Sequence, residues 1–188
     1  MVSRLLATLL LTLSLPLLAV LAVAVGLSMG RPVIFRQARS GRDGQEFTLV
    51  KFRSMSDLRD ADGKLLPDDG RTTRLGAILR RTRLDELPGL LNVAHGDMNF
   101  VGPRPLLPKT IAEQGAAGRR RGDVRPGLTG WAQVNGNTLL SLEEKIALDL
   151  WYIDNRSFWL DVRILGRTLL VMTGGERRTL AQEAGSGS

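Results

Sequence analysis

Two adjacent carboxylates, Asp85 and Glu86, follow a stretch of chain in which every charged residue is an arginine. An aspartate beside arginines has a lowered pKa and stays ionised at neutral pH, so it can coordinate Mg2+ or attack a phosphorus atom. The arrangement indicates a site for phosphates and a metal ion. A charged turn before a helix is the alternative interpretation. The arginines are Arg71, Arg74, Arg80, Arg81 and Arg83.

The residues after the acidic pair predict a helix. Pro88 fits the first helical turn, where its missing N–H is not needed, and Leu90, Leu91 and Val93 continue the apolar pattern. The positive end of such a helix would point toward the carboxylates and any phosphate near them.

A second candidate for phosphate binding is Arg104, which stands between Pro103 and Pro105 in a segment rich in glycine and proline. The prolines restrain the guanidinium before a ligand arrives, which suits bidentate binding of a phosphate. A structural ion pair is the alternative. His95 lies shortly before this segment, and we expect it to have a surface or hydrogen-bonding role rather than a catalytic one.

Residues 123–137 are dense in glycine and polar side chains, as is typical of a ligand-binding loop. Within this segment, Arg125 and Gln133 are predicted substrate-binding residues. The glycine spacing matches neither a Walker loop nor a dinucleotide fingerprint.

The composition narrows the class of partner. The 188 residues have room for one domain with a real core, and we expect one. A net charge of +7 points to phosphates, nucleic acid or an anionic membrane surface. The absence of cysteine excludes disulfides and thiolate chemistry, and the single histidine excludes a multi-histidine metal site. With 5% aromatic residues, base stacking on a basic sheet is not expected, so nucleic acid is disfavoured.

The N-terminal segment carries no charge from Leu5 to Met29. As a straight helix it would reach roughly 37 Å, at about 1.5 Å per residue, which is enough to cross a hydrocarbon core about 30 Å thick. A cleaved signal peptide, a spanning helix and a re-entrant helix all fit. A cleavage site could lie at residues 22–24, but the apolar run is longer than is usual for a signal peptide.

Two features bear on the topology of this segment. Pro16 lies near its middle and predicts a kink, and Ser14 could bond a carbonyl that the kink frees. Arginines follow the segment closely, while only Arg4 precedes it, so the C-terminal side should be cytoplasmic. The arginines that follow are Arg31, Arg36, Arg39 and Arg42.

Several further elements can be predicted. Residues 33–35 and 47–50 are expected to form a β-hairpin with its loop at residues 40–44, and Lys51 and Arg53 would face one side if the second strand continues. Thr73 is expected to cap a helix over residues 75–83, with Leu75, Ile78 and Leu79 on one face. Ser141 and Glu144 form a capping box that opens a helix whose apolar face carries Leu142, Ile146, Leu150 and Ile153. Residues 158–172 predict an interfacial helix, with ordinary core packing as the alternative, and residues 181–188 a disordered tail.

Six short blocks, in this order and spacing, resemble those of the bacterial sugar transferases, which are monotopic polyprenyl-phosphate phosphoglycosyl transferases. The resemblance covers almost the whole chain and is closest to the short form that holds only the catalytic core. The blocks are Val33-Ile34-Phe35-Arg36-Gln37, Lys51-Phe52-Arg53-Ser54-Met55, Leu84-Asp85-Glu86-Leu87-Pro88, Gly96-Asp97-Met98, Val101-Gly102-Pro103-Arg104-Pro105 and Arg125-Pro126-Gly127-Leu128-Thr129-Gly130.

The resemblance implies an activity. Members move a sugar-1-phosphate from a nucleotide sugar, here expected to be a UDP-sugar, to undecaprenyl phosphate and release the nucleoside monophosphate. It implies that Asp85 forms a covalent phosphosugar intermediate, that Glu86 helps to hold Mg2+, and that Lys51, Arg80 and Arg104 bind phosphates. The location it implies is the cytoplasmic face of the bacterial inner membrane.

The resemblance also implies a re-entrant membrane helix, broken at a Ser-Pro pair, with both ends cytoplasmic. The chain departs from the pattern here, because Leu15 precedes Pro16 and Ser14 lies one position too early. The basic start of the family is reduced to Ser3 and Arg4.

Together these observations predict an α+β protein that is mostly helical, with a small β-hairpin, a re-entrant membrane helix at residues 1–30 broken at Pro16, and amphipathic interfacial helices. Residues 31–180 would form the cytoplasmic catalytic domain. The rivals are a non-catalytic, membrane-tethered basic protein that binds anionic lipids or polyanions, and a secreted basic protein behind a signal peptide. The sugar, the glycoconjugate pathway and the oligomeric state are left open.

Overall fold

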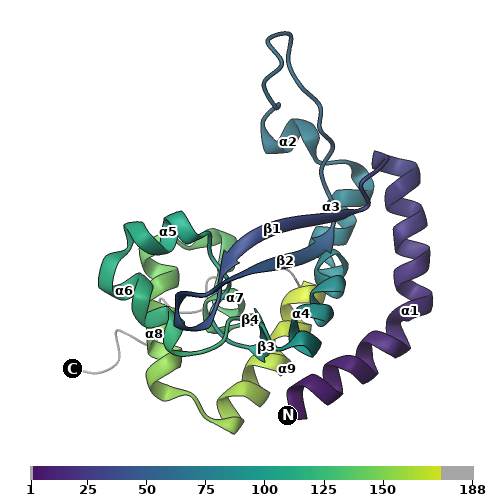
Figure 1. Ribbon diagram of the computed structural model, residues 1–188. Coiled ribbons are helices and arrows are strands. Elements are labelled where there is room, and N and C mark those ends of the chain that lie inside the picture. Colours follow the sequence, from purple (N-terminus) through teal and green to yellow (C-terminus); the bar gives the residue numbers. More distant parts are fainter. Residues whose placement is uncertain (1, 175–188) are drawn as a thin grey trace. The chain divides into compact units, whose positions relative to one another are not determined.

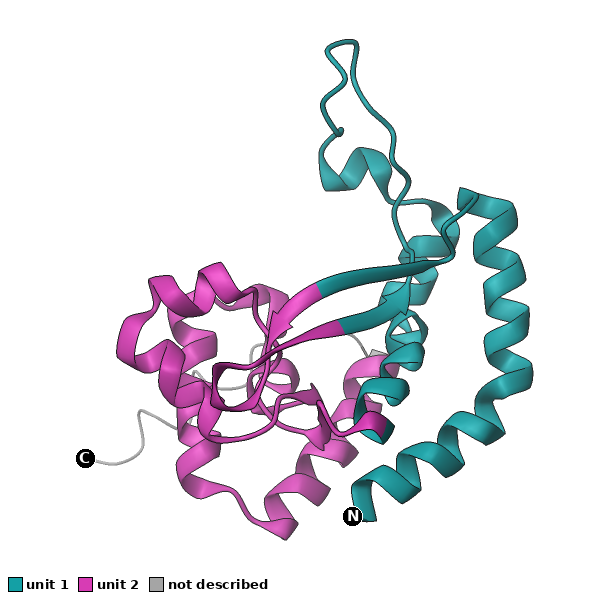
Figure 2. Cartoon of the chain, viewed as in Figure 1, with its two compact units in different colours: residues 1–37, 49–94 teal, residues 38–48, 95–188 magenta. Residues whose placement is uncertain are grey.

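The computed structural model describes residues 2–174, which are mostly helical and include two small two-stranded sheets (Figure 1). The mostly helical prediction and the small hairpin are confirmed. The chain forms two compact units, Met1–Gln37 with Leu49–Ala94, and Ala38–Thr48 with His95–Ser188 (Figure 2). We expected one domain. Both hairpin strands run from one unit into the other, so the sequence has no linker that marks the division. The predicted boundary at residue 30 stays a prediction, and the tail at 181–188 lies outside the described residues.

The first unit begins with the long apolar helix α1, Val2–Met29, which is long and apolar enough to cross a membrane. Pro16 lies inside it, and the helix bends without being interrupted (Figure 1). Ser14 does not bond the carbonyl that Pro16 leaves without its donor, which is that of Thr12. Its hydroxyl donates to the Leu10 carbonyl at 2.7 Å, and the hydroxyls of Thr12 and Thr8 likewise donate to the carbonyls four residues before them. Such bonds favour bending of a helix.

The remaining elements of this unit follow the hairpin. Strand β1 (Ile34–Ser40) pairs with β2 (Glu46–Phe52) around the short 3-10 helix η1 (Arg42–Gly44). Helices α2 (Asp68–Arg71) and α3 (Arg74–Arg81), the 3-10 helix η2 (Leu84–Gly89) and helix α4 (Leu90–His95) come next. The Thr73 cap is confirmed, since its hydroxyl accepts from the Gly76 amide at 3.0 Å.

The core of the first unit joins α1 to the segment before the acidic pair. Val25, Phe52 and Leu79 are fully buried, and Leu75 and Leu84 pack against them. The predicted apolar face of α3 is wrong at Ile78, which is 54% exposed. Gly76 takes the buried place instead, because a side chain there would collide with the Ser54 carbonyl. The residues of α1 and its continuation that pack on this core are Leu18, Leu21, Ala22, Met29, Val33 and Ile34.

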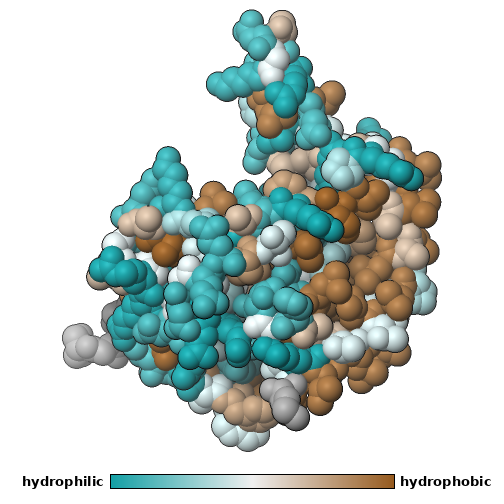
Figure 3. Space-filling view, viewed as in Figure 1, coloured by the Kyte–Doolittle hydropathy of each residue, from teal (hydrophilic) through white to brown (hydrophobic). Residues whose placement is uncertain are grey.

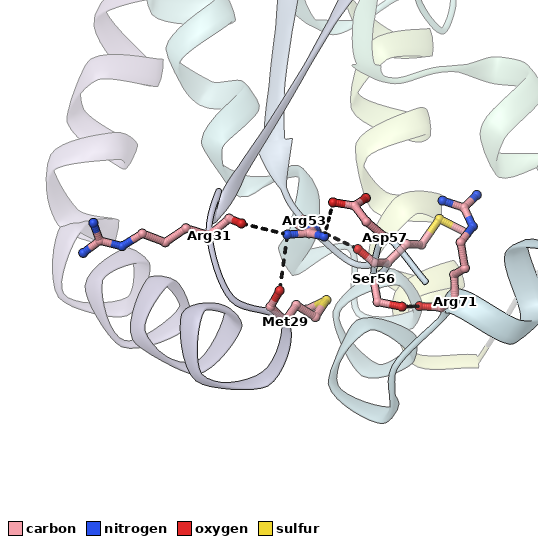
Figure 4. A network of polar contacts seen from close by, with 7 residues as sticks. Met29, Arg31, Arg53, Ser56, Asp57 and Arg71 are labelled. Carbon is pink, nitrogen blue, oxygen red and sulfur yellow. Dashed lines mark hydrogen bonds and ion pairs between the residues drawn. The ribbon is translucent and has the colours of Figure 1, made fainter. Parts of the chain in front are cut away.

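A buried arginine fastens the end of α1 (Figure 4). The strand ends at Phe52, so Arg53 does not share a strand face with Lys51 but turns inward. Its guanidinium donates to the carbonyls of Met29 (3.2 Å), Arg31 (3.3 Å) and Met55 (2.9 Å), and to the Asp57 carboxylate at 2.6 Å. One side chain thus ties the end of α1 to the chain that leaves β2.

The second unit contains a sheet that the sequence did not predict. Strand β3 (Asn99–Val101) pairs in parallel with β4 (Gly127–Thr129), with Val101 opposite Thr129. The helices are α5 (Pro108–Glu113), α6 (Gly115–Arg120), η3 (Arg121–Asp123), α7 (Trp131–Val134), η4 (Asn137–Leu139), α8 (Leu142–Asn155) and α9 (Phe158–Gly174).

The core of the second unit forms where α8 and α9 pack on α7 and β3. Its buried side chains are Val101, Trp131, Val134, Tyr152, Leu160 and Ile164. The capping box that opens α8 is confirmed, with the Ser141 hydroxyl accepting from the Glu144 amide and the Glu144 carboxylate accepting from the Ser141 amide.

We predict that Arg53→Met lowers the unfolding free energy in detergent by about 4 kcal/mol or more, because three main-chain carbonyls lose a charged donor and such bonds contribute about 1.5–3 kcal/mol each. The melting temperature in detergent reports the loss. Arg59→Met is the matched control, since Arg59 donates to the Gly63 carbonyl in an exposed turn. Equal shifts for the two variants would contradict the role of Arg53.

Candidate active site

The acidic pair lies in the tight 3-10 turn η2, where successive residues point about a third of a turn apart. Asp85 is therefore buried, at 5% exposure, whereas the Glu86 side chain is 22% exposed. The Glu86 carboxylate faces the Arg83 guanidinium at 3.7 Å. Pro88 belongs to this turn rather than to the first turn of α4, which corrects the prediction that a helix begins at Pro88. Two neighbouring carboxylates thus occupy different environments.

The chain enters η2 through an unusual backbone conformation. Helix α3 ends at Arg81, two residues earlier than predicted, and Arg83 adopts a left-handed conformation with φ 55°. A non-glycine residue in this region costs on the order of 1–3 kcal/mol, and such strain gathers at functional sites. The Thr82 hydroxyl donates to the Ile78 carbonyl at 2.8 Å, and the Arg83 amide donates to the Arg80 carbonyl at 3.2 Å. These bonds close the end of α3 and aim the chain into η2.

Lys51 and Arg80, two of the predicted phosphate-binding residues, belong to the same unit as the acidic pair. Lys51 lies on β2 with its ammonium 5.3 Å from the centre of the Phe35 ring. Arg80 is exposed in the last turn of α3. Their roles in binding phosphate stay predictions.

The other three predicted substrate-binding residues belong to the second unit and do not share one cavity. Arg104 lines a cavity of about 330 Å³ together with Arg119 and Arg121. Arg125 lines a different, more polar hollow of about 240 Å³. Gln133 is buried at 2% exposure, and its amide nitrogen donates to the Leu128 carbonyl at 3.0 Å. Its amide oxygen is buried without a hydrogen-bond partner among the described residues.

His95 matches the expected surface role. Its Nδ1 atom lies 3.4 Å from the Asp97 carboxylate, and the side chain is 83% exposed.

A divalent cation would have few protein ligands. Within residues 2–174, no group of three or more histidine, aspartate or glutamate side chains is arranged to hold a metal. The donor set of Asp85 and Glu86 nevertheless fits Mg2+, which usually takes one or two carboxylates and completes its shell with water and substrate phosphates.

The sequence analysis missed a buried ion pair between η3 and α8. Arg121 donates to one carboxylate oxygen of Asp149 at 3.0 and 2.6 Å, and the side chains are 4% and 3% exposed. Burial raises the pKa of the Asp149 carboxyl to about 6, although Arg121 opposes the shift. One signal was available. Asp149 follows Ile146 by three residues, so an acidic residue lies on the apolar face of α8.

The comparison with known proteins agrees with the order of these motifs. Residues 1–175 match the family model of the bacterial sugar transferases. The chain is 51% identical over 145 residues to an uncharacterized sugar transferase, EpsL, of Bacillus subtilis, covering 77% of this chain and 72% of that protein.

Longer relatives match over most of this chain. It is 43% identical to the UDP-glucose:undecaprenyl-phosphate glucose-1-phosphate transferase of Escherichia coli, covering 87% of this chain and 38% of that protein. It is 39% identical to the UDP-N-acetylgalactosamine-undecaprenyl-phosphate N-acetylgalactosaminephosphotransferase of Aeromonas hydrophila, covering 85% of this chain and 40% of that protein. The chain thus spans less than half the length of these two relatives. The family match and the identities together show that this chain belongs to the bacterial sugar transferase family.

Proposed function

We propose that the protein is a phosphoglycosyl transferase that moves a sugar-1-phosphate from a UDP-sugar to undecaprenyl phosphate and releases UMP. The observation that carries the proposal is the buried Asp85 beside the Glu86–Arg83 pair, in a turn whose Leu84 packs in the same core as the apolar helix α1. Chemistry and membrane anchor thus belong to one unit. The names of the two longer relatives share UDP and undecaprenyl phosphate but differ in the sugar, so the proposal leaves the sugar open.

The reaction would proceed in two displacements. A carboxylate oxygen of Asp85 attacks the phosphorus that bears the sugar, and the bond to the bridging oxygen breaks, so UMP leaves with the electron pair. An oxygen of undecaprenyl phosphate then attacks the same phosphorus, and the acyl phosphate bond breaks to restore the Asp85 carboxylate. Two steps let a soluble donor and a lipid acceptor use one nucleophile in turn.

The burial of Asp85 suits this chemistry. An acyl phosphate must survive until the acceptor arrives, and a residue that is 5% exposed offers water little access. The carboxylate and the pyrophosphate are both anionic, so attack requires positive charge on the phosphoryl oxygens. Glu86 and the phosphates of the donor would hold Mg2+, which supplies part of that charge when bound. We propose that Lys51 and Arg80, which belong to the unit of the acidic pair, supply the rest, that Arg104 and Arg125 bind substrate phosphates, and that Gln133 supports the substrate loop.

The proposed seat is the cytoplasmic leaflet of the bacterial inner membrane. The surface over α1 is almost continuously apolar (Figure 3), and its exposed residues include Leu5, Leu9, Leu13 and Val20. Helix α9 buries Leu160 and Ile164 but exposes apolar side chains on its other faces, as an interfacial helix does. These are Phe158, Trp159, Val162, Leu165, Leu169 and Leu170.

The core of the first unit argues against removal of the N-terminal segment. Cleavage after Ala24 would take Leu18, Leu21 and Ala22 out of the cluster around Phe52 and Leu79. A signal peptide has no such part in the mature fold, so we propose that α1 is retained as a re-entrant helix with both ends cytoplasmic. Pro16 inside α1 and the bend of this helix in Figure 1 support this topology.

We predict that enzyme incubated with UDP-sugar and Mg2+, without lipid acceptor, gains one phosphosugar mass and releases one UMP per active chain. Peptide mapping should place the mass on Asp85. The nearly isosteric Asp85→Asn should abolish the adduct and keep the melting temperature, whereas Glu86→Gln should slow its formation and weaken the Mg2+ dependence. A strict requirement for acceptor before UMP appears, with no adduct, would rule out the two-step route. A non-catalytic lipid binder would bind vesicles and yield neither product.

Arg104→Lys should lower turnover about 10-fold or more, equivalent to about 1.4 kcal/mol of transition-state stabilisation, because lysine keeps the charge but not the two parallel bonds of the guanidinium. Steady-state kinetics with UDP-sugar and polyprenyl phosphate measure the loss. Arg120→Lys is the control, since Arg120 pairs with Asp154 at the surface. Unchanged turnover for Arg104→Lys would assign Arg104 a structural role.

The chain lacks cysteine, so single cysteines can report its topology. A cysteine at Ser3 should be protected from an impermeant thiol reagent added outside intact cells and should react once the cells are permeabilised. A cysteine at Asp62, in the exposed turn after β2, is the cytoplasmic control. Pro16→Ala should straighten α1 and raise labelling at Ser3. Labelling of the unaltered helix at Ser3 from outside would show that it spans the membrane.

A further inference from the structure

The backbone that carries Arg104 is held at every carbonyl. Four consecutive carbonyls, at residues 103–106, each accept a hydrogen bond from a different donor elsewhere in the second unit. The pairs are Pro103 with the Gly127 amide (3.0 Å), Arg104 with Arg121 Nη2 (2.7 Å), Pro105 with Arg39 Nη1 (3.2 Å) and Leu106 with the Ser40 amide (3.0 Å). Prolines on both sides of Arg104 already fix two φ angles. We call residues 103–106 the Arg104 loop.

Arg121 differs from the other donors because it is a fully buried charge. Its guanidinium binds the Asp149 carboxylate on one side and the Arg104 carbonyl on the other. A buried ion pair is a poor stabiliser, since apolar side chains of similar volume often serve the fold as well or better. The planar fork of arginine, however, can satisfy two acceptors at fixed angles.

A neighbouring ion pair shows that linking these segments does not require burial. Arg120, the residue before Arg121, pairs with Asp154 of the same helix α8. Both side chains of this pair are about half exposed. No bond from Arg120 to the Arg104 loop is present among the described contacts. The Arg121–Asp149 pair thus differs from it in two ways, its burial and its bond to the Arg104 carbonyl.

The loop lines a cavity that brings arginines together. Arg104 and Arg119 line it along with one carboxylate, that of Asp43, and the pKa of Arg39 is lowered by burial and by the charge of Arg104. Like charges brought together repel each other, so the arginine side chains would move apart unless the backbone held them. A rigid loop keeps Arg104 directed for an anion before the anion binds.

We propose that Arg121, oriented by Asp149, is a positioning residue that sets the direction of Arg104 for a phosphate of the donor substrate. This inference rests on the proposed transferase function. It assigns the buried pair a role in substrate binding rather than in holding α8 to η3. Arg121 also lines the cavity, but its Nε and Nη2 atoms donate to Asp149 and the Arg104 carbonyl, so its proposed role is to hold the loop.

The test removes the pair without leaving a buried charge. The double variant Arg121→Met with Asp149→Leu should keep the wild-type melting temperature but raise the KM for UDP-sugar about 10-fold, with the KM for polyprenyl phosphate unchanged. In an Arg104→Ala background, the same double change should alter the KM less than about 2-fold, because the group being positioned is gone. The control pair, Arg120→Gln with Asp154→Asn, should leave both KM values unchanged. A double variant with wild-type KM, or equal effects with and without Arg104, would overturn the proposal.

A second measurement does not depend on activity. Amide hydrogen exchange at Gly127 and Ser40, whose amides donate to the Pro103 and Leu106 carbonyls of the loop, should quicken about 10-fold in the double variant and stay unchanged in the Arg120–Asp154 control. If the wild-type chain transfers no sugar phosphate, the proposed function fails while exchange still tests the positioning. Should the double variant not fold, Arg121→Lys keeps the charge opposite Asp149 but not the fork, and it should show the same changes several-fold smaller. Wild-type exchange and KM in Arg121→Lys would then refute the role.

Discussion

The buried guanidinium of Arg53 is the interaction on which the first unit depends. The last carbonyls of an α-helix have no partner within the helix, and in the apolar helix α1 one of them is that of Met29. Arg53 satisfies it together with the Arg31 carbonyl. Because Phe52, the residue before Arg53, lies in the same core as Leu79 and Leu84, one packed cluster fixes α1 relative to the turn that carries Asp85. In the proposed membrane seat, this cluster would set the depth of Asp85, which a flexible linker would leave undefined.

In the proposed mechanism the two carboxylates of the motif need opposite environments, and the 3-10 turn supplies them. A nucleophile that forms an acyl phosphate benefits from shielding against water, whereas a metal ligand must reach a hydrated ion. In an α-helix, a proline two residues after the pair would have clashed with the preceding turn. In η2, Asp85 turns inward and Glu86 toward Arg83, and Pro88 closes the turn. Arg83 adopts a strained left-handed conformation, which lets the chain turn sharply from α3 into η2.

Features with a local physical cause could be predicted from the sequence. The Thr73 cap, the Ser141–Glu144 capping box and the hairpin each depend on a few neighbouring residues. The β3–β4 sheet could not be predicted, because strands of three residues carry no alternation and their partners lie far apart in the chain. The feature of the sequence that pointed to this sheet was its glycines. A side chain at Gly102, Gly127 or Gly130 would come within 2.5 Å of main-chain atoms, so the two segments can approach only as glycine.

Charge was harder to interpret than pattern, because the sequence does not tell which arginines meet solvent. The net charge of +7 suggested a broad surface for phosphates. In the structure, several guanidinium groups instead donate hydrogen bonds to main-chain carbonyls. Those of Arg53, Arg71 and Arg121 are among them. Arginine suits this task because it stays charged when buried and presents its donors in a rigid fork. In its proposed role as a phosphate-binding residue, Arg104 must itself be held in place: its carbonyl is bound by Arg121, while its own side chain lines a cavity. A high arginine content in such a chain therefore has two causes. One is the negative charge of the ligand, and the other is the number of main-chain carbonyls that irregular backbone leaves without a partner.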